Sequence, residues 1–151
     1  MDKLYLDTGA LVKLYIIEQG SEFVQKTAQS AKILPIHSLQ ITELRNALHA
    51  AQGRDIISRK TLIKSLNNFD EDLESGVFQQ EQPNWDFLWK RSEQLINKFT
   101  AKFLCRTLDI LHVAAAEDCN ADAVLTGYHR QSQLCKVIGL QVIIINLSKL
   151  P

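Results

Sequence analysis

The sequence predicts an α/β sandwich built on a parallel β-sheet, and two patterns support this prediction. Short apolar runs rich in Ile and Val occur at residues 4–6, 33–36, 123–126 and 142–145. Such runs are typical of strands that are buried on both faces. Longer stretches with the apolar spacing of helices separate them. Because helices that connect buried strands pack against the faces of a parallel sheet, this alternation indicates the α/β class.

Helices are expected wherever apolar residues recur with helical spacing. They are assigned to residues 9–17, 20–31, 38–53, 58–75, 84–101, 108–118 and 129–138. The polar, Gln-rich segment 76–83 fits either a short edge strand or a loop that leads into the next helix. No linker or low-complexity stretch divides the chain, so a single domain over residues 1–151 is expected.

The composition is that of one charge-balanced domain. The 151 residues are 46% hydrophobic, and 17 basic side chains balance 17 acidic ones, so nucleic-acid binding would depend on local clusters of charge. Cys105, Cys119 and Cys135 are odd in number and lack C-x-x-C spacing, which favours buried reduced thiols over disulfides or a zinc site. No apolar run reaches membrane-spanning length. A cytoplasmic protein with no membrane partner is therefore expected.

Three acidic residues occupy positions on the apolar side of their elements. Asp7 closes the first strand run, Glu43 lies within the apolar face of the helix at 38–53, and Asp109 lies near the start of the helix at 108–118. Burial of an ionised carboxylate costs on the order of several kcal/mol unless it is paired, hydrogen-bonded or bound to a metal. If the three side chains converge, they need a cation.

Each acid also has a structural interpretation. Asp7 lies where open α/β sheets form ligand crevices, but it could equally cap the following helix. Glu43 could pair with a base, although Arg45 at i+2 points away from it on a helix. Asp109 falls in the first turn of a helix that Thr107 is expected to cap, where the helix dipole favours negative charge.

Four segments together resemble the PIN-domain family over essentially the whole chain. They are Tyr-Leu-Asp-Thr-Gly-Ala-Leu at 5–11, the Thr42-Glu43 pair, Asp-Ile-Leu-His-Val-Ala-Ala-Ala at 109–116, and Ala-Val-Leu-Thr-Gly-Tyr at 123–128. Within that family the sequence looks most like the VapC-like toxins of toxin-antitoxin pairs. The resemblance implies a three-layer α/β/α PIN-like fold with a central parallel sheet of four to five strands.

The resemblance also implies an activity. It indicates a metal-dependent endoribonuclease, a hydrolase of RNA phosphodiester bonds, with Mg²⁺ or Mn²⁺ held by Asp7, Glu43 and Asp109. Asp7 and Asp109 would hold the metal directly, whereas Glu43 would bind it directly or through water and orient the nucleophile. A cognate antitoxin protein and a homodimer are further implications.

The sequence departs from the family pattern at two positions. Gly9 stands where the family usually has Ser, and Tyr128 stands where it commonly has a fourth acid. Neutral Tyr is a poor ligand for a hard divalent cation, so a site for one metal ion is favoured. Asp122 and His129 lie nearby in sequence but are not obvious replacements for the missing acid.

Other residues are candidates for contacts with substrate or with the acids: Thr8, Arg106, His112, Thr126, Tyr128 and Arg130. Each has a more ordinary alternative, because Thr at a strand end is often a local cap, single bases are often solvated, and a lone His is often a core residue. Trp85 and Trp89 lie one helical turn apart, and packing against the core is favoured over base stacking.

Two alternatives to the ribonuclease remain. In the first, the chain is a PIN-fold RNA-binding or protein-interaction module that lost catalysis when Tyr128 replaced the fourth acid. In the second, it is a phosphate-accepting signalling domain with a similar sheet. The signalling domain fits less well, because no adjacent pair of acids follows an early strand and Glu43 lies within a helix.

Overall fold

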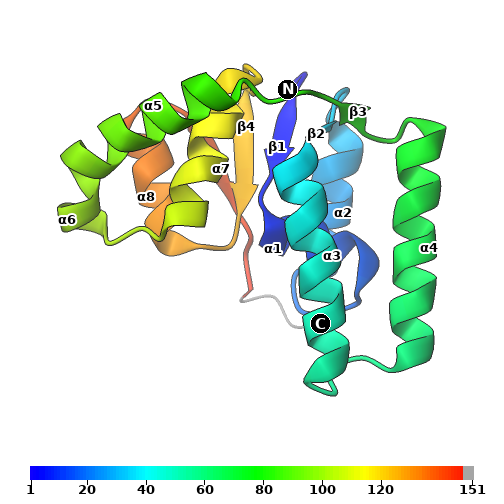
Figure 1. Cartoon of the computed structure of the whole chain (residues 1–151). Helices are drawn as coiled ribbons and strands as arrows, with labels where there is room; N and C mark the ends of the chain where they lie inside the picture. The colour runs from blue at the N-terminus through cyan, green and yellow to red at the C-terminus, as the bar shows by residue number, and fades with distance from the viewer. Residues whose placement is uncertain (148–151) are drawn as a thin grey trace.

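The computed structural model describes residues 1–147 (Figure 1). Helices follow almost every strand. In chain order the elements are β1 (Leu4–Leu6), α1 (Thr8–Tyr15), α2 (Ser21–Ser30), β2 (Pro35–Ile36), α3 (Ser38–Gly53), α4 (Arg59–Ser75), β3 (Gln79–Gln80), α5 (Trp85–Leu95), the π-helical turn η1 (Ile96–Thr100), α6 (Ala101–Phe103), α7 (Thr107–Asp118), β4 (Ala123–Thr126), α8 (His129–Val137) and β5 (Gln141–Ile144).

The main sheet has three parallel strands in the order β1-β4-β5. β2 and β3 form a separate parallel pair, which meets β1 through a single bridge between Lys3 and Ile33. The expectation of four to five strands in one sheet is therefore too high. Pro35 has no N–H to donate to a ladder, and β2 ends after two residues, so pairing with β1 does not extend. β3 shows that the Gln-rich segment does contain a short edge strand.

Successive residues of β1 and β4 face opposite sides of the sheet, as the two-residue period of a strand requires. Leu4 and Leu6 join a hydrophobic cluster with α1, α2, α3 and α4. Tyr5, which lies between them, joins a second cluster with α5, α7 and α8. On β4, Leu125 and Val124 divide in the same way. Helices thus cover both faces, which confirms the three-layer α/β/α architecture.

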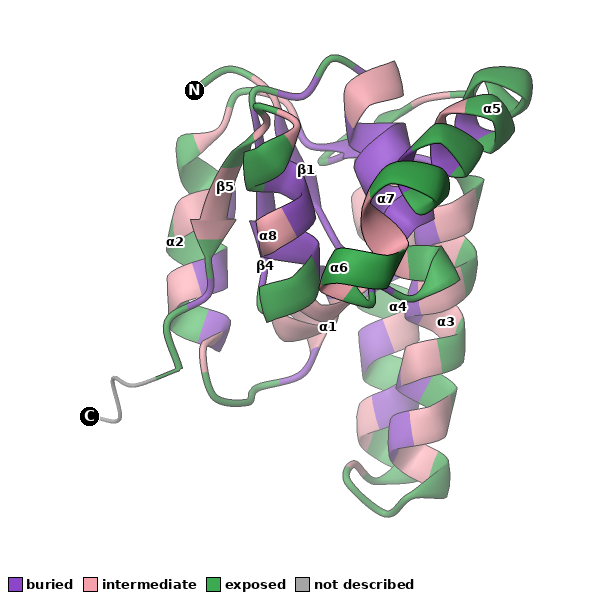
Figure 2. Ribbon diagram, turned by 90° about the vertical axis from the view of Figure 1, so that its left-hand side faces the viewer, coloured by how far each residue is buried: buried purple, intermediate pink, exposed green. Residues whose placement is uncertain are grey.

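The helix α7 is the most deeply buried helix of the second cluster, and Figure 2 shows it packed between the sheet and α5. Every residue from Ile110 to Ala116 is buried. The helix α5 crosses α7, and two hydrogen bonds from Arg91 to Glu117, at 2.6 and 2.9 Å, connect the two helices. Cys105, Cys119 and Cys135 are free and buried, as predicted.

The helix expected at 84–101 is present, but after Leu95 it continues through the π-helical turn into the short α6. The expectation for the two Trp residues of this region is wrong. Trp85 and Trp89 do not pack into the core: their rings stack on each other 5.6 Å apart and are 36% and 56% exposed. Leu88, by contrast, is fully buried and packs in the cluster that contains α7. None of the described helices is long and apolar enough to cross a membrane.

Candidate active site at the carboxyl edge of the sheet

Three helices begin at one edge of the main sheet, where β1 and β4 end (Figure 1). The first residues of α1, α7 and α8 follow Asp7, Arg106 and Tyr128. A cavity of about 440 Å³ opens here. It is lined by Asp7, Thr8, Glu43, Arg106, Thr107, Leu108, Asp109, His112, Tyr128 and Gln131. The structure therefore brings all three predicted acids to one cavity, and the partial positive charge of helix N-termini favours anionic groups there.

Asp7 is almost fully buried, with 1% of its surface exposed. Its Oδ1 accepts a 2.7 Å hydrogen bond from the backbone N–H of Ala10 and caps α1. Its Oδ2 is buried and has no hydrogen-bond partner among the described groups. Burial raises the pKa of Asp7, although hydrogen bonding and the nearby His112 oppose this effect. One oxygen thus serves the fold, and the other remains free to bind a ligand.

Glu43 reaches the cavity from α3, at the edge of the buried stripe that contains Leu44 and Leu48. Its Oε2 accepts a 3.0 Å hydrogen bond from the hydroxyl of Thr8 and pairs with Nε2 of His112. Burial raises the pKa of Glu43, but these hydrogen bonds and the charge of His112 lower it further than burial raises it. The net effect favours the carboxylate form of Glu43.

A buried chain of polar groups holds His112 in place behind Glu43. The hydroxyl of Tyr5 lies 2.8 Å from Nδ1 of His112 and 3.1 Å from Nε2 of His37. All three side chains are buried, and burial lowers the pKa of His37 to about 4. The expectation that His112 is a core residue is confirmed, but His112 also orients Glu43. Tyr5 and His37 were not predicted, because each is a buried residue on an apolar run and neither resembles a ligand.

Asp109 lies in the first turn of α7. Its Oδ2 accepts a hydrogen bond from the backbone N–H of Arg106 at 3.3 Å and lies 3.5 Å from the Arg106 Nε. The expected cap, Thr107, is instead the first helical residue, and Arg106 occupies the N-cap position. The side chain of Asp109 therefore accepts the capping hydrogen bond at the start of its own helix. This arrangement fixes Arg106 at the mouth of the cavity.

Arg45, Thr126 and Arg130 do not line the cavity. Arg45 pairs with Asp70 at 2.6 Å rather than with Glu43, as its i+2 position predicted. The hydroxyl of Thr126 donates to Oε1 of Gln131 and accepts a 3.0 Å hydrogen bond from the backbone N–H of Tyr128, so Thr126 acts as a buried local cap after β4. Arg130 donates to the carbonyl of Leu104 at 3.1 Å.

Gln131 is a cavity residue that the sequence did not single out. It is fully buried, and its Nε2 donates to the backbone carbonyl of Asp109 at 3.2 Å. This bond ties the start of α8 to the start of α7. Its position three residues after Tyr128 on a short helix was the one available signal, and glutamine at such a position is too common to be diagnostic.

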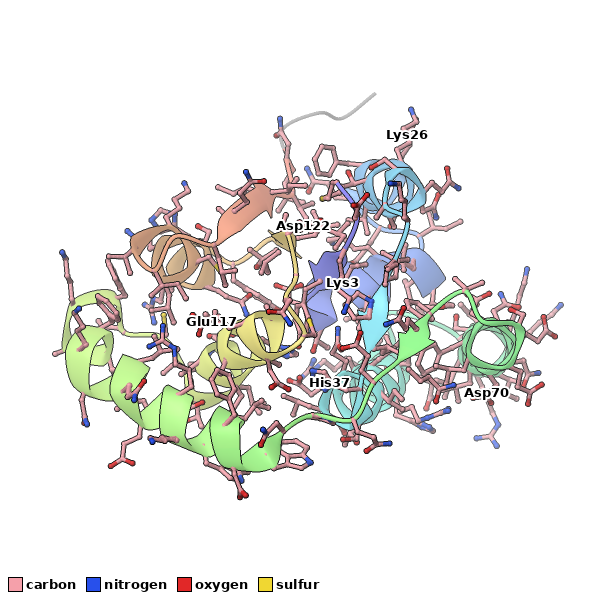
Figure 3. All side chains as sticks on the ribbon, turned by 90° about the horizontal axis from the view of Figure 1, so that it is seen from above. Lys3, Lys26, His37, Asp70, Glu117 and Asp122 are labelled. Carbon is pink, nitrogen blue, oxygen red and sulfur yellow. The ribbon has the colours of Figure 1, made fainter. Side chains whose placement is uncertain are left out.

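Tyr128 lines the cavity, and neither Asp122 nor His129 does. Asp122 lies at the other end of β4, where its Oδ2 accepts hydrogen bonds from the backbone N–H groups of Asp2 and Lys3 at 2.8 and 2.9 Å (Figure 3). His129 is exposed at the start of α8. The prediction that neither would substitute is consistent with these positions.

The donor set fits a hard divalent cation. Asp7, Glu43 and Asp109 offer carboxylate oxygens, which Mg²⁺ and Mn²⁺ prefer, and a buried carboxylate oxygen without a partner is costly unless a ligand completes it. Across residues 1–147, however, no three His, Cys, Asp or Glu side chains are already grouped to hold a metal ion. Glu43 is paired with His112, and Asp109 is paired with Arg106.

No protein-family model matches the sequence, and no curated protein matches it. Solved structures do share its fold. One is the structure of VapBC2 from Rickettsia felis bound to a DNA fragment from the VapBC2 promoter. It gives a TM-score of 0.67 at 13% identity, and the match covers 95% of this chain and 99% of that chain. The structure of FitAcB from Neisseria gonorrhoeae gives a TM-score of 0.57 at 14% identity, and the match covers 97% of this chain and 99% of that chain.

A third solved structure is a domain of a functionally unknown protein from Methanocaldococcus jannaschii. It gives a TM-score of 0.54 at 18% identity and covers 100% of this chain and 96% of that chain. At these identities the likeness concerns the fold alone. Together the three structures confirm the predicted PIN-like α/β fold along the length of the chain.

Proposed function

We propose that this protein is a metal-dependent endoribonuclease of the VapC-like toxin type, which hydrolyses RNA phosphodiester bonds. The observation that supports this best is the free, buried Oδ2 of Asp7 in a cavity that Glu43 and Asp109 also line. Buried carboxylates that converge on a cavity are suited to a divalent cation, and the PIN-like fold places them at the sheet edge where α/β proteins bind ligands.

In this proposal Asp7 and Asp109 hold a Mg²⁺ or Mn²⁺ ion, and Glu43 binds it directly or through water. The bound ion would supply an activated water and neutralise charge on the scissile phosphate. Glu43, held by Thr8 and His112, orients the attacking water. Arg106 and the N-termini of α7 and α8 offer positive charge to the RNA backbone.

The proposal extends to partners. The sequence resemblance to VapC-like toxins supports a cognate antitoxin protein, a homodimer and action in the cytoplasm. A second cavity, of about 410 Å³, lies among α1, α2, α4 and the segment that precedes β3, and its walls include Leu14, Ala28 and Phe78. None of the three acids lines this cavity, so an antitoxin segment confined to it would leave them accessible.

The test is cleavage of total RNA by the purified protein with Mg²⁺ or Mn²⁺, compared with the same reaction in chelator. Asp7→Asn and Asp109→Asn should each abolish metal-dependent cleavage, a loss of at least about a hundredfold, because each removes a charged metal ligand. Asp86→Asn, an exposed acid of α5, is the matched control and should cleave as the wild type does. Undiminished cleavage by both site variants would contradict the assignment.

A second candidate function is favoured by Tyr128, which brings a neutral side chain to the place of a fourth acid. In this alternative the protein is a PIN-fold module that binds RNA or protein without turnover. RNA binding with no cleavage over a wide range of Mg²⁺ and Mn²⁺ concentrations would support it, whereas metal-dependent cleavage that Asp7→Asn abolishes would exclude it.

A further inference from the structure

Tyr128 separates two cavities. On one side is the front cavity, the space of about 440 Å³ that contains the three acids. On the other is a rear cavity of about 260 Å³, whose walls also include Gly9, Val12, Gly127 and Ile145. Lys13 and Glu18 reach the rear cavity as an ion pair at 2.6 Å, so its charges are balanced and most of its surface is apolar.

The ring of Tyr128 fits against Gly9. A Cβ atom at position 9 would lie 3.3 Å from Cε2 and 3.4 Å from the hydroxyl oxygen of Tyr128, and 3.5 Å from Oδ1 of Asp7. The first distance is tighter than ordinary van der Waals contact, so a side chain at position 9 would displace the ring. The two departures from the family pattern are therefore in contact, and the absent side chain of Gly9 makes room for Tyr128 beside Asp7.

Tyr128 is also positioned by Arg106. The guanidinium carbon lies 5.9 Å from the ring centroid, within the range of a cation–π contact. The ring nevertheless remains 44% exposed, so it has surface available for a ligand. An aromatic ring that contacts a guanidinium group on one side, is partly exposed and adjoins the proposed site of the scissile phosphate is the kind of platform on which nucleobases stack.

We infer that Tyr128 is a base-stacking residue and that the rear cavity receives an unpaired nucleobase of the RNA whose scissile phosphate lies in the front cavity. The inference rests on the proposed function for its substrate. It assigns a role to the residue that replaces the fourth acid: Tyr128 exchanges metal or water contacts for a contact with the base, so the enzyme would select single-stranded RNA at the cleaved position.

Binding of a fluorescently labelled single-stranded RNA oligonucleotide to the whole protein in chelator tests this without any cleavage. Tyr128→Ala should weaken binding by about tenfold, as expected for loss of one stacked base, whereas Tyr128→Phe should bind within about twofold of the wild type because the ring is retained. Gly127→Val, which projects a side chain from a wall of the rear cavity with ordinary contacts for its Cβ, should weaken binding similarly. Trp89→Ala removes an exposed aromatic outside both cavities and should have no effect.

An abasic series of the same oligonucleotide separates stacking from a structural effect. With the wild type, one abasic position should cost about tenfold in affinity, and with Tyr128→Ala the same position should cost nothing further. Equal losses for Tyr128→Ala and Tyr128→Phe would overturn stacking in favour of a hydroxyl contact. Wild-type affinity of Tyr128→Ala, at an unchanged melting temperature, would overturn the inference altogether.

Different experimental results would refute the stacking role of Tyr128 and the proposed nuclease function. Metal-dependent cleavage that is lost in Asp7→Asn, together with RNA binding that is indifferent to Tyr128, would retain the nuclease and refute the stacking role. Binding that depends on Tyr128 in a protein that never cleaves RNA would retain the stacking role and refute the nuclease.

Discussion

The two carboxylate oxygens of Asp7 have different roles at the scale of a single residue. Oδ1 caps α1, and Oδ2 is buried without a partner. A charge kept in this state lowers the stability of the fold, which is a common feature of functional sites. Asp7 can therefore serve both as a helix cap and as a metal ligand, because each of its two oxygens can take one of these roles.

Asp7→Asn should accordingly stabilise the metal-free protein by roughly 1 kcal/mol at pH 7, because the amide oxygen keeps the cap and the buried charge is removed. Burial raises the pKa of Asp7 in the folded state. The gain is therefore present at neutral pH, shrinks as the pH falls through the raised folded-state pKa, and is gone near the ordinary value of about 4, below which the carboxyl group is neutral in both states. Urea unfolding at several pH values measures this.

Addition of Mg²⁺ provides the complementary measurement. It should raise the unfolding midpoint of the wild type, because a ligand that binds the folded state stabilises it, and it should leave Asp7→Asn unchanged. Asp86→Asn again serves as the control that retains the response. A metal-free Asp7→Asn protein less stable than the wild type at pH 7 would show that the carboxylate is satisfied in a way the structure does not contain.

The residues predicted from the sequence were those that break a pattern. Asp7, Glu43 and Asp109 were found because acids rarely occupy apolar positions, and all three line the cavity. Gln131 was missed because a buried glutamine that bridges two helices conforms to its local pattern. Arg130 was a candidate because of its place in sequence, but a long side chain reaches its nearest acceptor, which here is the carbonyl of Leu104.

At the scale of elements, most helices and strands begin and end close to the residues expected from periodicity. The helix at 38–53 was predicted with its observed bounds, because Gly53 and the polar residues after it end the apolar pattern. The break after Leu95 was not predicted. The sequence from 84 to 101 keeps helical spacing throughout, and a π-helical turn changes hydrogen bonding without changing composition.

The strand β4 is joined to the N-terminus by an acid. Asp122 Oδ2 accepts hydrogen bonds from the backbone N–H groups of Lys3 and Asp2, and these bonds lower its pKa. The backbone N–H of Asp122 in turn donates to the carbonyl of Lys3 at 2.9 Å. The start of β4 is therefore held in register with the start of β1, at the end of the sheet opposite the acids.

Asp122→Ala should lower the melting temperature at pH 7 by removing this link. A depressed folded-state pKa contributes stability above the ordinary Asp value of about 4 and loses it as the pH falls through the folded value. The difference in melting temperature between the variant and the wild type should therefore shrink below pH 4, as followed by circular dichroism. A difference that stays constant down to acidic pH would attribute the loss to something other than the carboxylate.

At the scale of the whole molecule, the sheet separates two hydrophobic clusters that share its strands. One lies with α1, α2, α3 and α4, and the other with α5, α7 and α8. Of the three acids, Asp7 follows the outer strand β1 of the main sheet, Glu43 belongs to the first group of helices and Asp109 to the second. The cavity thus forms only when both clusters are packed against the same sheet, which no single segment of the sequence could reveal.

This coupling predicts one cooperative unfolding transition. The two Trp residues of the chain, Trp85 and Trp89, both lie on α5, so their fluorescence reports the second cluster. Leu48→Ala removes a fully buried side chain from the first cluster and should cost about 2–5 kcal/mol. If the sheet transmits this loss, the urea midpoints from Trp fluorescence and from far-UV circular dichroism will shift downward together.

Leu88→Ala makes the equivalent change in the second cluster, and its two midpoints should also coincide. Ile17→Ala, at a residue that is 96% exposed, should leave both midpoints in place. A Leu48→Ala protein whose Trp midpoint stays at the wild-type value while its circular dichroism midpoint falls would show that the clusters unfold separately. In that case Glu43 could leave the cavity while Asp109 remained in place, and the site would open by local unfolding of the α3 side rather than persist as a rigid feature of the fold.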